Sequence, residues 1–361
     1  MTVNVLIDGR ALVGNPTGIG VHTAAIASRL GMVPLPMICT HSPIAADQQP
    51  ASCRFRVDSA FNGVWWQQMI LPRIARNESA DVVWGPHTTL PVALDRPAVV
   101  SAHDLSSITM PGRHRLKTIL SFNVFVRSSL EKAAAIAAVS RHTADQIVRG
   151  FGIPASRITI VPNGVEESFV PARGTDSGLP ERLRGRDYIL YVGTLEPRKG
   201  IDDLISAWRT LPSRPTLVLC GDAGWGGRAW RQGTTDDPGI LLTGFVSRDQ
   251  LRSLYQNATL FVYPSRYEGF GLPPLEAMAC GAPVITTRAG AIPEVVGDAA
   301  VLVDPSDPPG LAKAMKNMLS DSGMRSEMSR RGIDRAVLFR WQRSADLMRE
   351  LLIGAASGGA R

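Results

Sequence analysis

Two glutamates eight positions apart lie in the segment SRYEGFGLPPLEAMACGAPVI, which covers residues 265–285. Residues 260–265 have the apolar composition of a buried strand. Glu268 follows among glycines, and Glu276 stands where the composition becomes helical. A strand, a glycine turn and a helix N-terminus together form a site where backbone N–H groups bind anions. The segment therefore predicts a diphosphate site. The residues expected around the phosphates are Gly269, Phe270, Gly271 and Leu272.

The role of Glu276 stays open at this point. A glutamate in the first turn of a helix stabilises the helix dipole, and a glutamate in a site can instead contact a ligand. Glu268 lies in the loop itself beside glycines, where a purely structural role is harder to explain.

A second glycine turn, YVGTLEPRKG at 191–200, contains two adjacent cations. Arg198 and Lys199 follow a predicted strand and precede a predicted helix. Two cations in that position could neutralise a departing diphosphate without a metal. An ordinary solvated turn is the alternative. Both turns are expected at the carboxyl ends of strands in the same half of the chain, which favours the anion site.

The N-terminal half contains two further candidate turns. GNPTGIGVHT, residues 14–23, places Gly18 and Gly20 before a helix. Thr23 stands where a dinucleotide fingerprint requires Gly or Ala, so a nicotinamide site is disfavoured. The turn could still bring the backbone close to another ligand. SAHDLSS places His103 and Asp104 at a strand end, where a His-Asp pair points to function more than a lone histidine does.

Composition limits the class of partner and ligand. The 39 basic and 32 acidic residues give a net charge of +7. This moderate excess suits a phosphate-bearing ligand or an anionic membrane and lacks the dense basic stripe of a nucleic-acid binder. The sequence has no HExxH, Cys/His cluster or paired Asp-x-Asp, so it predicts no metal site.

The cysteines and the apolar runs indicate a compartment. Cys39, Cys220 and Cys280 lie in or beside apolar runs, as small core residues do in a reducing compartment, and Cys53 shares no CxxC spacing with them. No apolar run approaches the ~20 residues that span a bilayer, and MTVNVLIDGR enters a predicted strand at once. We expect a cytoplasmic protein that can also contact the cytoplasmic face of the inner membrane.

Short apolar runs alternate with helix-length segments along the chain. The continuous Val, Ile and Leu runs predict parallel strands covered on both faces, in two doubly wound α/β domains with a cleft between them. The predicted boundaries are 1–170 for the N-terminal, acceptor-binding domain, 171–187 for a linker and 188–339 for the C-terminal domain. A helix within 340–355 could belong to either domain. The predicted strands are 3–9, 80–86, 97–104, 134–140 and 157–165, then 187–194, 215–222, 239–246, 258–265, 282–287 and 299–304.

Together these residues resemble the retaining GT-B glycosyltransferases of family 4, which use nucleotide-sugars. Glu268 and Glu276 reproduce the family's Glu-x7-Glu signature. YVGTLEPRKG, RITIVPNGV, LTGFV and IPEVVGDAAVLVDP are similar to further family motifs and occur in the family's order. The N-terminal IDGRALVGNPTGIGVHT is similar to the subgroup that includes bacterial O-antigen mannosyltransferases.

The resemblance implies a role for each matching residue. Arg198 and Lys199 would bind the donor diphosphate, and Glu276 would accept hydrogen bonds from the ribose. Glu268 would contact the transferred sugar, and His103 would contact it from the acceptor side with Asp104 as base or helper. Front-side attack, in which the departing phosphate takes the proton, would make Glu268 an orienting group. The other residues implied at the donor site are Gly18, Gly20, Gly193, Thr194, Gly244 and Val246, the last beside the nucleobase.

The leading hypothesis is transfer of mannose from GDP-mannose to a lipid-linked glycan in O-antigen or exopolysaccharide synthesis, with no metal or other cofactor. A UDP-sugar donor, a sugar-nucleotide epimerase or hydrolase, and an inactive binding module are the alternatives. The segment at 110–132 mixes basic and apolar residues, and it is either a packed amphipathic helix or a surface that contacts a membrane.

Overall fold

A computed structural model describes residues 2–14, 17–105, 125–172, 178–222, 224 and 237–358 of the chain. The chain forms two compact units. Unit 1 comprises Met1–Gly164 and Arg340–Arg361, and unit 2 comprises Val165–Phe339. The division at 164/165 and at 339/340 differs from the predicted boundary at 170 and from the predicted linker at 171–187. In unit 2, Leu179 and Leu183 are buried, so the described end of that segment is packed like a core element.

Unit 1 is built on a parallel sheet with the strand order β3-β2-β1-β4-β5-β6-β7. Its strands are β1 (Val5–Asp8), β2 (Met37–Thr40), β3 (Arg54–Val57), β4 (Val82–Gly85), β5 (Ala98–Ala102), β6 (Ala135–Ala138) and β7 (Ile158–Ile160). The helical elements described for this unit are η1 (Gly9–Leu12), α1 (Gly18–Ala27), η2 (Ala46–Gln48), α2 (Gly63–Trp65), η3 (Trp66–Ile70), α3 (Leu71–Asn77), α6 (Arg141–Phe151), η5 (Ala155–Arg157) and α14 (Trp341–Gly358).

Unit 2 repeats the plan with a sheet in the order β10-β9-β8-β11-β12-β13. Its strands are β8 (Tyr188–Val192), β9 (Thr216–Cys220), β10 (Ile240–Gly244), β11 (Leu260–Tyr263), β12 (Val284–Thr287) and β13 (Val301–Val303). The helical elements described for it are η6 (Glu181–Leu183), η7 (Pro197–Lys199), α7 (Ile201–Arg209), α9 (Arg248–Gln256), α10 (Leu272–Ala279), α11 (Ile292–Val296), α12 (Pro308–Ser320) and α13 (Ser322–Ala336).

The predicted strands agree with the sheets except at two places. All eleven predicted runs contain a strand, because apolar runs such as those of β4 and β11 are buried along their whole length. The sequence did not predict β2 and β3. β3 has the residues RFRV and is largely exposed at the sheet edge, so it lacks the apolar signal of a buried strand. Cys39, Cys220 and Cys280 are free and buried, as expected.

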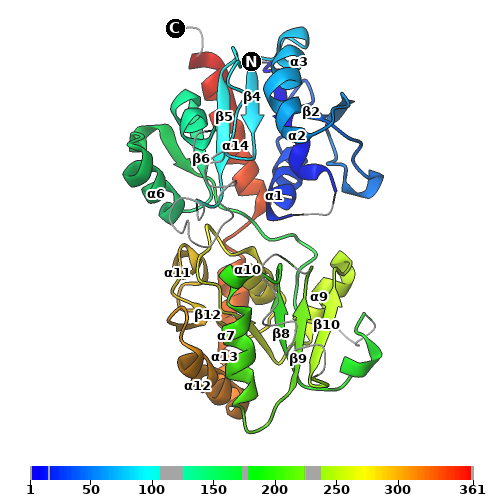
Figure 1. Cartoon of the computed structure of the whole chain (residues 1–361), viewed down its shortest axis with the longest axis vertical. Coiled ribbons are helices and arrows are strands. Elements are labelled where there is room, and N and C mark those ends of the chain that lie inside the picture. Colours follow the sequence, from blue (N-terminus) through cyan, green and yellow to red (C-terminus); the bar gives the residue numbers. More distant parts are fainter. Residues whose placement is uncertain are drawn as a thin grey trace. The chain divides into compact units, whose positions relative to one another are not determined.

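The C-terminal helix α14 packs within unit 1, beside β4 and β5 (Figure 1). Trp341, its first residue, is buried, and a Cβ on Gly164 would lie 2.3 Å from the Trp341 backbone nitrogen. The absence of a side chain at residue 164 therefore allows the chain to re-enter unit 1 close to the point where it left.

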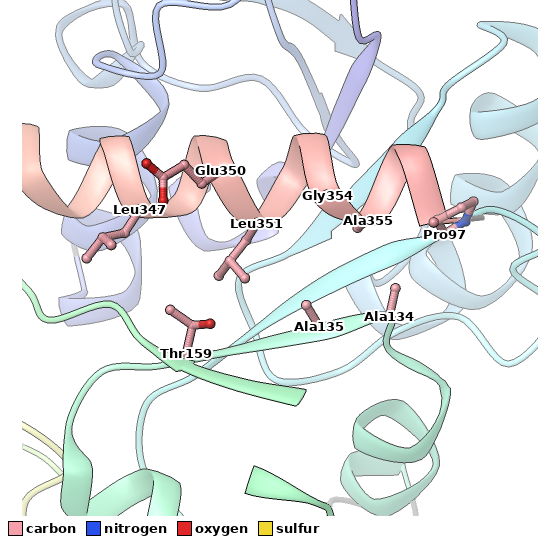
Figure 2. Close-up of a pocket in the computed structure, with 10 residues that line it drawn as sticks. Pro97, Ala134, Ala135, Thr159, Leu347, Glu350, Leu351, Gly354 and Ala355 are labelled. Atoms are coloured by element: carbon pink, nitrogen blue, oxygen red, sulfur yellow. The ribbon is translucent and has the colours of Figure 1, made fainter. Parts of the chain in front are cut away.

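A pocket of about 530 Å³ lies between α14 and the strands β6 and β7. Figure 2 shows Leu347 and Leu351 pointing from α14 toward Thr159 and Ala135. The pocket also touches Pro97, which precedes β5, and Ala134, which precedes β6. It therefore opens at the amino ends of the strands, whereas ligands of parallel α/β sheets bind at the carboxyl ends.

Candidate active site

The two glycine turns of unit 2 meet because β8 and β11 are neighbours at the centre of the sheet. From β8 the chain continues outward to β9 and β10, and from β11 it continues in the opposite direction to β12 and β13. The carboxyl ends of two strands whose connections diverge flank a crevice that binds ligands in folds of this class. The turn at 193–200 follows β8, and the turn at 264–271 follows β11. The predicted basic turn and the predicted Glu-Gly turn therefore flank this crevice.

Glu268 lies buried at this point, and one of its carboxylate oxygens is fully engaged. Lys199 Nζ donates to Glu268 Oε1 at 2.6 Å, and Arg198 Nη1 lies 3.7 Å from the same oxygen. The hydroxyls of Ser265 and Tyr263 donate to it at 2.6 and 2.9 Å. Among the described residues none donates a hydrogen bond to Oε2. The contacts therefore fix the orientation of the carboxylate and leave one oxygen able to accept from a ligand.

The ionisation of Glu268 follows from these contacts. Burial by itself raises the pKa of a carboxyl group, but the charges of Lys199 and Arg198 and the hydrogen bonds outweigh it. The pKa of Glu268 consequently lies below its ordinary value. The cluster is a carboxylate held against two cations, which is a local charge of about +1 before Glu196 is counted.

The basic turn is held in place by the Arg198 side chain and by a close approach of its backbone to the second turn. Arg198 donates to the Tyr267 carbonyl at 2.8 Å and to Glu196 Oε1 at 2.9 Å. Gly200 has a φ of +70°, and a Cβ there would lie 2.2 Å from the Pro264 carbonyl oxygen. The two turns therefore touch through main-chain atoms, and a side chain at residue 200 would separate them.

Helix α10 begins at this site as predicted, with Gly271 as its N-cap at φ +106° and a proline in its first turn. Glu276 is its fifth residue, and the first turn contains no acidic residue. The first-turn interpretation of Glu276 is therefore wrong. The Phe270 ring is buried against Phe339, with ring centroids 5.9 Å apart, so its side chain serves the core and only its backbone can face a ligand.

Glu276 is instead buried in a second polar cluster. The Tyr255 hydroxyl donates to Glu276 Oε2 at 3.1 Å, and Arg248 Nη1 lies 3.5 Å from Oε1. Arg248 is shared with Glu166, whose Oε1 lies 2.6 Å from Nη2, and its guanidinium covers the Phe169 ring. Burial raises the pKa of Glu276 above its ordinary value, although Arg248 and the Tyr255 hydrogen bond oppose this.

The other residues predicted at the donor site of unit 2 also follow strand ends. Gly193 follows β8, with a φ of +147° and its N–H donating to the Cys220 carbonyl. Thr194 beside it is exposed. Gly244 ends β10 with a φ of +65°, and Val246, two residues later, is half-buried. These residues therefore lie at the same carboxyl edge of the sheet as Glu268.

In unit 1, Gly18 and Gly20 lie in the first turn of α1, which Thr17 caps. A Cβ on Gly20 would lie 2.6 Å from the Ala11 carbonyl oxygen, so local packing already requires that glycine. A Cβ on Gly18 would meet no atom within 4 Å. Of the two, only Gly18 has open space for a ligand within its own unit.

His103 directly follows β5, and its hydrogen bond selects one tautomer. Its Nε2 lies 3.0 Å from the Pro86 carbonyl oxygen, which only accepts, so Nε2 carries the proton. Burial, together with His22 and His87, lowers the pKa of His103 well below its ordinary value. The neutral ring therefore presents Nδ1 as an acceptor, and no described residue donates to it. Asp104 follows His103 and is half-buried.

A buried polar chain lies beneath His103. The His22 ring packs edge-on against it with centroids 4.5 Å apart. His22 Nδ1 faces Asn163 Oδ1 at 2.7 Å, its Nε2 faces Ser101 Oγ at 3.2 Å, and Trp84 Nε1 donates to Ser101 Oγ at 3.0 Å. Because Asn163 Oδ1 only accepts, Nδ1 of the neutral His22 ring carries the proton, and Nε2 accepts from the Ser101 hydroxyl. Burial lowers the pKa of His22 to about 4, so no cation forms beside His103 near neutrality.

The switch point of unit 1, between β1 and β4, has its own ion pair. Asp8 is fully buried, and Arg10 donates to its two oxygens at 2.9 and 2.8 Å. Gln67 Nε2 donates to Asp8 Oδ2 at 3.0 Å. Burial raises the pKa of Asp8, but the Arg10 charge and hydrogen bonds outweigh it and leave the pKa below the ordinary value. The pair also anchors the start of α2, since Arg10 Nη1 donates to the Gly63 carbonyl.

Sequence reasoning missed several of these partners. Tyr263 and Ser265 lie in the apolar run at 260–265, LFVYPS, where hydroxyl groups at the end of a predicted strand were an available signal. Arg248, Tyr255 and His22 had none, because each lies on a helix and meets its partner only through tertiary packing. In the described part of the chain, no group of three or more His, Cys, Asp or Glu side chains is placed to hold a metal.

Asn163→Asp tests the buried polar chain. A carboxylate in place of the amide oxygen stabilises the His22 imidazolium, so we expect the pKa of His22 to rise from about 4 by roughly one to three units. In the wild-type protein the unfolded chain binds the extra proton between pH 6.5 and about 4, so stability falls as the pH is lowered through that window. The variant should lose less stability there. Imidazole NMR titration and thermal unfolding measure both, with His22→Gln as control. An unchanged His22 titration would contradict the assignment.

Glu276→Gln tests the buried carboxyl group. Because the folded pKa is raised, the folded state binds more protons than the unfolded state above the ordinary pKa of 4.5, and stability falls as the pH rises through the folded value. Glutamine does not ionise and so avoids this loss. The difference in melting temperature, variant minus wild type, should therefore increase as the pH rises from 4 to 7. Glu166→Gln removes the other carboxylate beside Arg248 and is the matched control. A difference that is constant with pH would argue against a raised pKa.

Two family models match the two parts of the chain. The model described as Glycosyltransferase Family 4 matches residues 16–169, and the model described as Glycosyl transferases group 1 matches residues 180–335. The chain is 37% identical over 269 residues to O-antigen chain mannosyltransferase B of Escherichia coli, which covers 72% of this chain and 70% of that protein. It is 31% identical over 266 residues, or 69% of its length, to the serotype-specific mannosyltransferase WbdA of Escherichia coli, of which it spans 32%.

Solved structures share the fold at low sequence identity. HepE of Anabaena in complex with UDP and glucose has a TM-score of 0.78 and 20% identity, and the match covers 98% of this chain and 100% of HepE. WaaG, a glycosyltransferase involved in lipopolysaccharide biosynthesis, has a TM-score of 0.75 and 17% identity, with 98% and 100% covered. These are GT-B glycosyltransferases, and their likeness establishes the fold. With models matching both parts and a relative at 37% identity, the chain belongs to glycosyltransferase family 4.

Proposed function

We propose that the protein is a retaining hexosyltransferase that moves mannose from GDP-mannose to a lipid-linked glycan in O-antigen or exopolysaccharide synthesis. The observation that carries the proposal is the cluster at the β8/β11 crevice, where Lys199 and Arg198 meet Glu268. The mannosyltransferase names of the relatives, O-antigen chain mannosyltransferase B and WbdA, support the choice of sugar and pathway.

In this mechanism the cations hold the donor diphosphate. Lys199 and Arg198 stabilise the charge that develops on the departing phosphate, and the backbone N–H groups at the start of α10 hold its oxygens. Arg198 and Lys199 take the place of a metal, so transfer should persist in a chelator. Glu276 accepts hydrogen bonds from the ribose hydroxyls, and the backbone near Gly244 and Val246 lines the nucleobase pocket.

The proposal gives the transferred sugar one contact residue on unit 2, Glu268, and one on unit 1, His103. Glu268 accepts a sugar hydroxyl at Oε2, and His103 accepts another at Nδ1, the atom that its bond to Pro86 leaves unprotonated. Gly18, in unit 1, is a further proposed contact of the phosphates. Neither Glu268 nor His103 needs to form a covalent bond, because in front-side attack the departing phosphate takes the acceptor's proton. Asp104 is a candidate helper for that proton.

The contact between Lys199 and Glu268 predicts opposite effects on binding and on transfer. Glu268→Gln keeps the shape but removes the charge that competes with phosphate for Lys199, so GDP should bind at least as tightly as in wild type. The rate of sugar transfer should fall by about 100-fold or more. One oxygen of Glu268 is replaced by an NH2 group, which cannot accept a hydrogen bond and must face either the two cations or the sugar. Lys199→Ala should weaken both.

Calorimetry with GDP and a transfer assay measure the two effects. Glu196→Gln is the matched control, because it removes a carboxylate bound to Arg198 at 2.9 Å while it keeps the Lys199 contact. If Glu268→Gln transferred sugar at the wild-type rate, the assignment of Glu268 to the site would be wrong.

The donor and the reaction are tested together by substrate comparison. Calorimetry with GDP, UDP and ADP should give the tightest binding for GDP. Tight binding of UDP alone would mean that the donor is a UDP-sugar and not GDP-mannose. Product analysis with GDP-mannose and a lipid-linked acceptor should show an elongated glycan with the anomeric configuration retained. Free or epimerised sugar without elongation would instead identify a hydrolase or an epimerase, and no turnover would identify a binding module.

We also propose peripheral contact with the cytoplasmic face of the membrane, where a lipid-linked acceptor would be found. Within the described residues no helix has both the length and the apolar composition to cross a bilayer. The basic and apolar segment predicted for this contact, 110–132, lies outside the described residues up to residue 124, and residues 125–132 are helical.

A further inference from the structure

The turn after β11 contains an arginine, Arg266, two residues before Glu268. Its side chain is only 13% exposed, and each of its three nitrogens donates to a different segment of unit 2. Nη1 donates to the Pro197 carbonyl at 2.6 Å, Nη2 to Asp203 Oδ2 at 2.7 Å and Nε to Ser306 Oγ at 2.9 Å. A planar guanidinium held by three acceptors has one orientation, so Arg266 can act as a rigid link between these segments.

Arg266 contacts the basic turn through the main chain of that turn. The cations Arg198 and Lys199 belong to η7, which has three residues, and an element this short depends on tertiary contacts for its conformation. The Arg266 side chain donates to the first carbonyl of η7, that of Pro197, and the Arg266 backbone N–H donates to the second, that of Arg198, at 2.9 Å. Glu268, by contrast, contacts the turn through the side chain of Lys199.

Asp203 connects Arg266 to the other end of the same turn. It lies in the first turn of α7, which begins directly after Gly200. Its side chain is 12% exposed and forms an ion pair with Arg266. Arg266 therefore holds the chain before the two cations, at Pro197, and after them, at Asp203.

A bound diphosphate would weaken the contact between Lys199 and Glu268. Phosphate oxygens and the Glu268 carboxylate are both anionic acceptors, and they compete for the Lys199 ammonium. The contacts of Arg266 differ, because each of its nitrogens already has a protein acceptor and the side chain is largely buried. The basic turn therefore needs a support other than Glu268 when the ligand is bound, and Arg266 provides one.

We propose that Arg266 is a positioning residue that holds Arg198 and Lys199 where the donor diphosphate binds. Charges fixed in advance stabilise a departing phosphate without having to reorient during the reaction. The inference rests on the proposed function, in that the two cations bind the diphosphate. It does not depend on which base or sugar the donor carries.

Calorimetry of the full chain with GDP, UDP and inorganic pyrophosphate tests the proposal. Arg266→Gln removes the contacts that hold the basic turn, so each ligand that the wild-type protein binds should bind about tenfold more weakly. Arg266→Lys keeps the charge but cannot reach three acceptors at once, so it should restore little of the affinity. Asp203→Asn should cause a smaller loss, because Arg266 keeps its contact with Pro197.

Arg325→Gln is the matched control. Arg325 is a half-buried arginine of unit 2 that donates to two main-chain carbonyls, those of Met318 and Leu319, each at 2.7 Å. These carbonyls lie at the end of α12, away from the basic turn in the sequence. Its loss should leave the affinity for all three ligands unchanged.

A double-mutant cycle with Lys199→Ala separates positioning from a purely structural role. If Arg266 acts through the cations, Arg266→Gln should weaken GDP binding by a smaller factor in the Lys199→Ala background than in the wild-type protein. A purely structural role would lower the melting temperature, and the two losses of affinity would multiply. The rate of sugar transfer by Arg266→Gln should fall by about 100-fold, since displaced cations no longer meet the departing phosphate.

Three results would overturn the inference: wild-type affinity in a folded Arg266→Gln protein, independent effects in the cycle, or an equal loss in Arg325→Gln. If Arg266→Gln does not fold, Asp203→Asn takes its place in the cycle and the same results decide. Unchanged affinity in Lys199→Ala would instead contradict the proposed function, on which the inference rests. Tight binding of UDP alone would change the donor, and a loss of UDP affinity in Arg266→Gln would then support the role of Arg266.

Discussion

The candidate site depends on the pairing of β8 with β11. These strands are separated by more than sixty residues in the chain, yet their parallel contact sets the carboxyl end of one beside that of the other. Lys199 follows the first strand and Glu268 the second, and the pairing brings Nζ to 2.6 Å from Oε1. A buried carboxylate is costly unless it is paired and hydrogen-bonded, and here three donors and the nearby Arg198 cation converge on one oxygen. The second oxygen is thereby left for a ligand, on a group that cannot rotate freely.

The two glutamates of the signature lie in opposite electrostatic environments. Glu268 has two cations and two hydroxyls, so its pKa is lowered, whereas Glu276 shares a single arginine with Glu166, so burial prevails and its pKa is raised. A group held against its own ionisation preference does not stabilise the fold by its charge. This environment is compatible with the contact to the ribose hydroxyls that we propose for Glu276.

In unit 1 the polar contacts determine where the protons lie on two histidines, whereas in unit 2 they determine the ionisation of two glutamates. The Pro86 carbonyl selects the tautomer of His103, and burial keeps His22 neutral beside it although the Asn163 hydrogen bond favours the charged ring. Both effects need tertiary contacts: Asn163 lies 141 positions from His22 in the sequence. All the described members of this polar network lie within unit 1.

The sequence determined the local elements and the types of residue at the site. Apolar runs predicted eleven strands, the glycine turns predicted both strand-end loops, and the spacing of Glu268 and Glu276 carried the family resemblance. It did not reveal β3, whose residues are mostly polar and exposed, or the partners Tyr263, Tyr255, Arg248 and His22. It also left Glu276 between two interpretations, and only the observed start of α10 excluded one of them. The physical reason is the same in each case: periodicity and turn chemistry act between neighbours in the chain, whereas strand order and side-chain partners are chosen by contacts between segments far apart, and only the tertiary structure decides those.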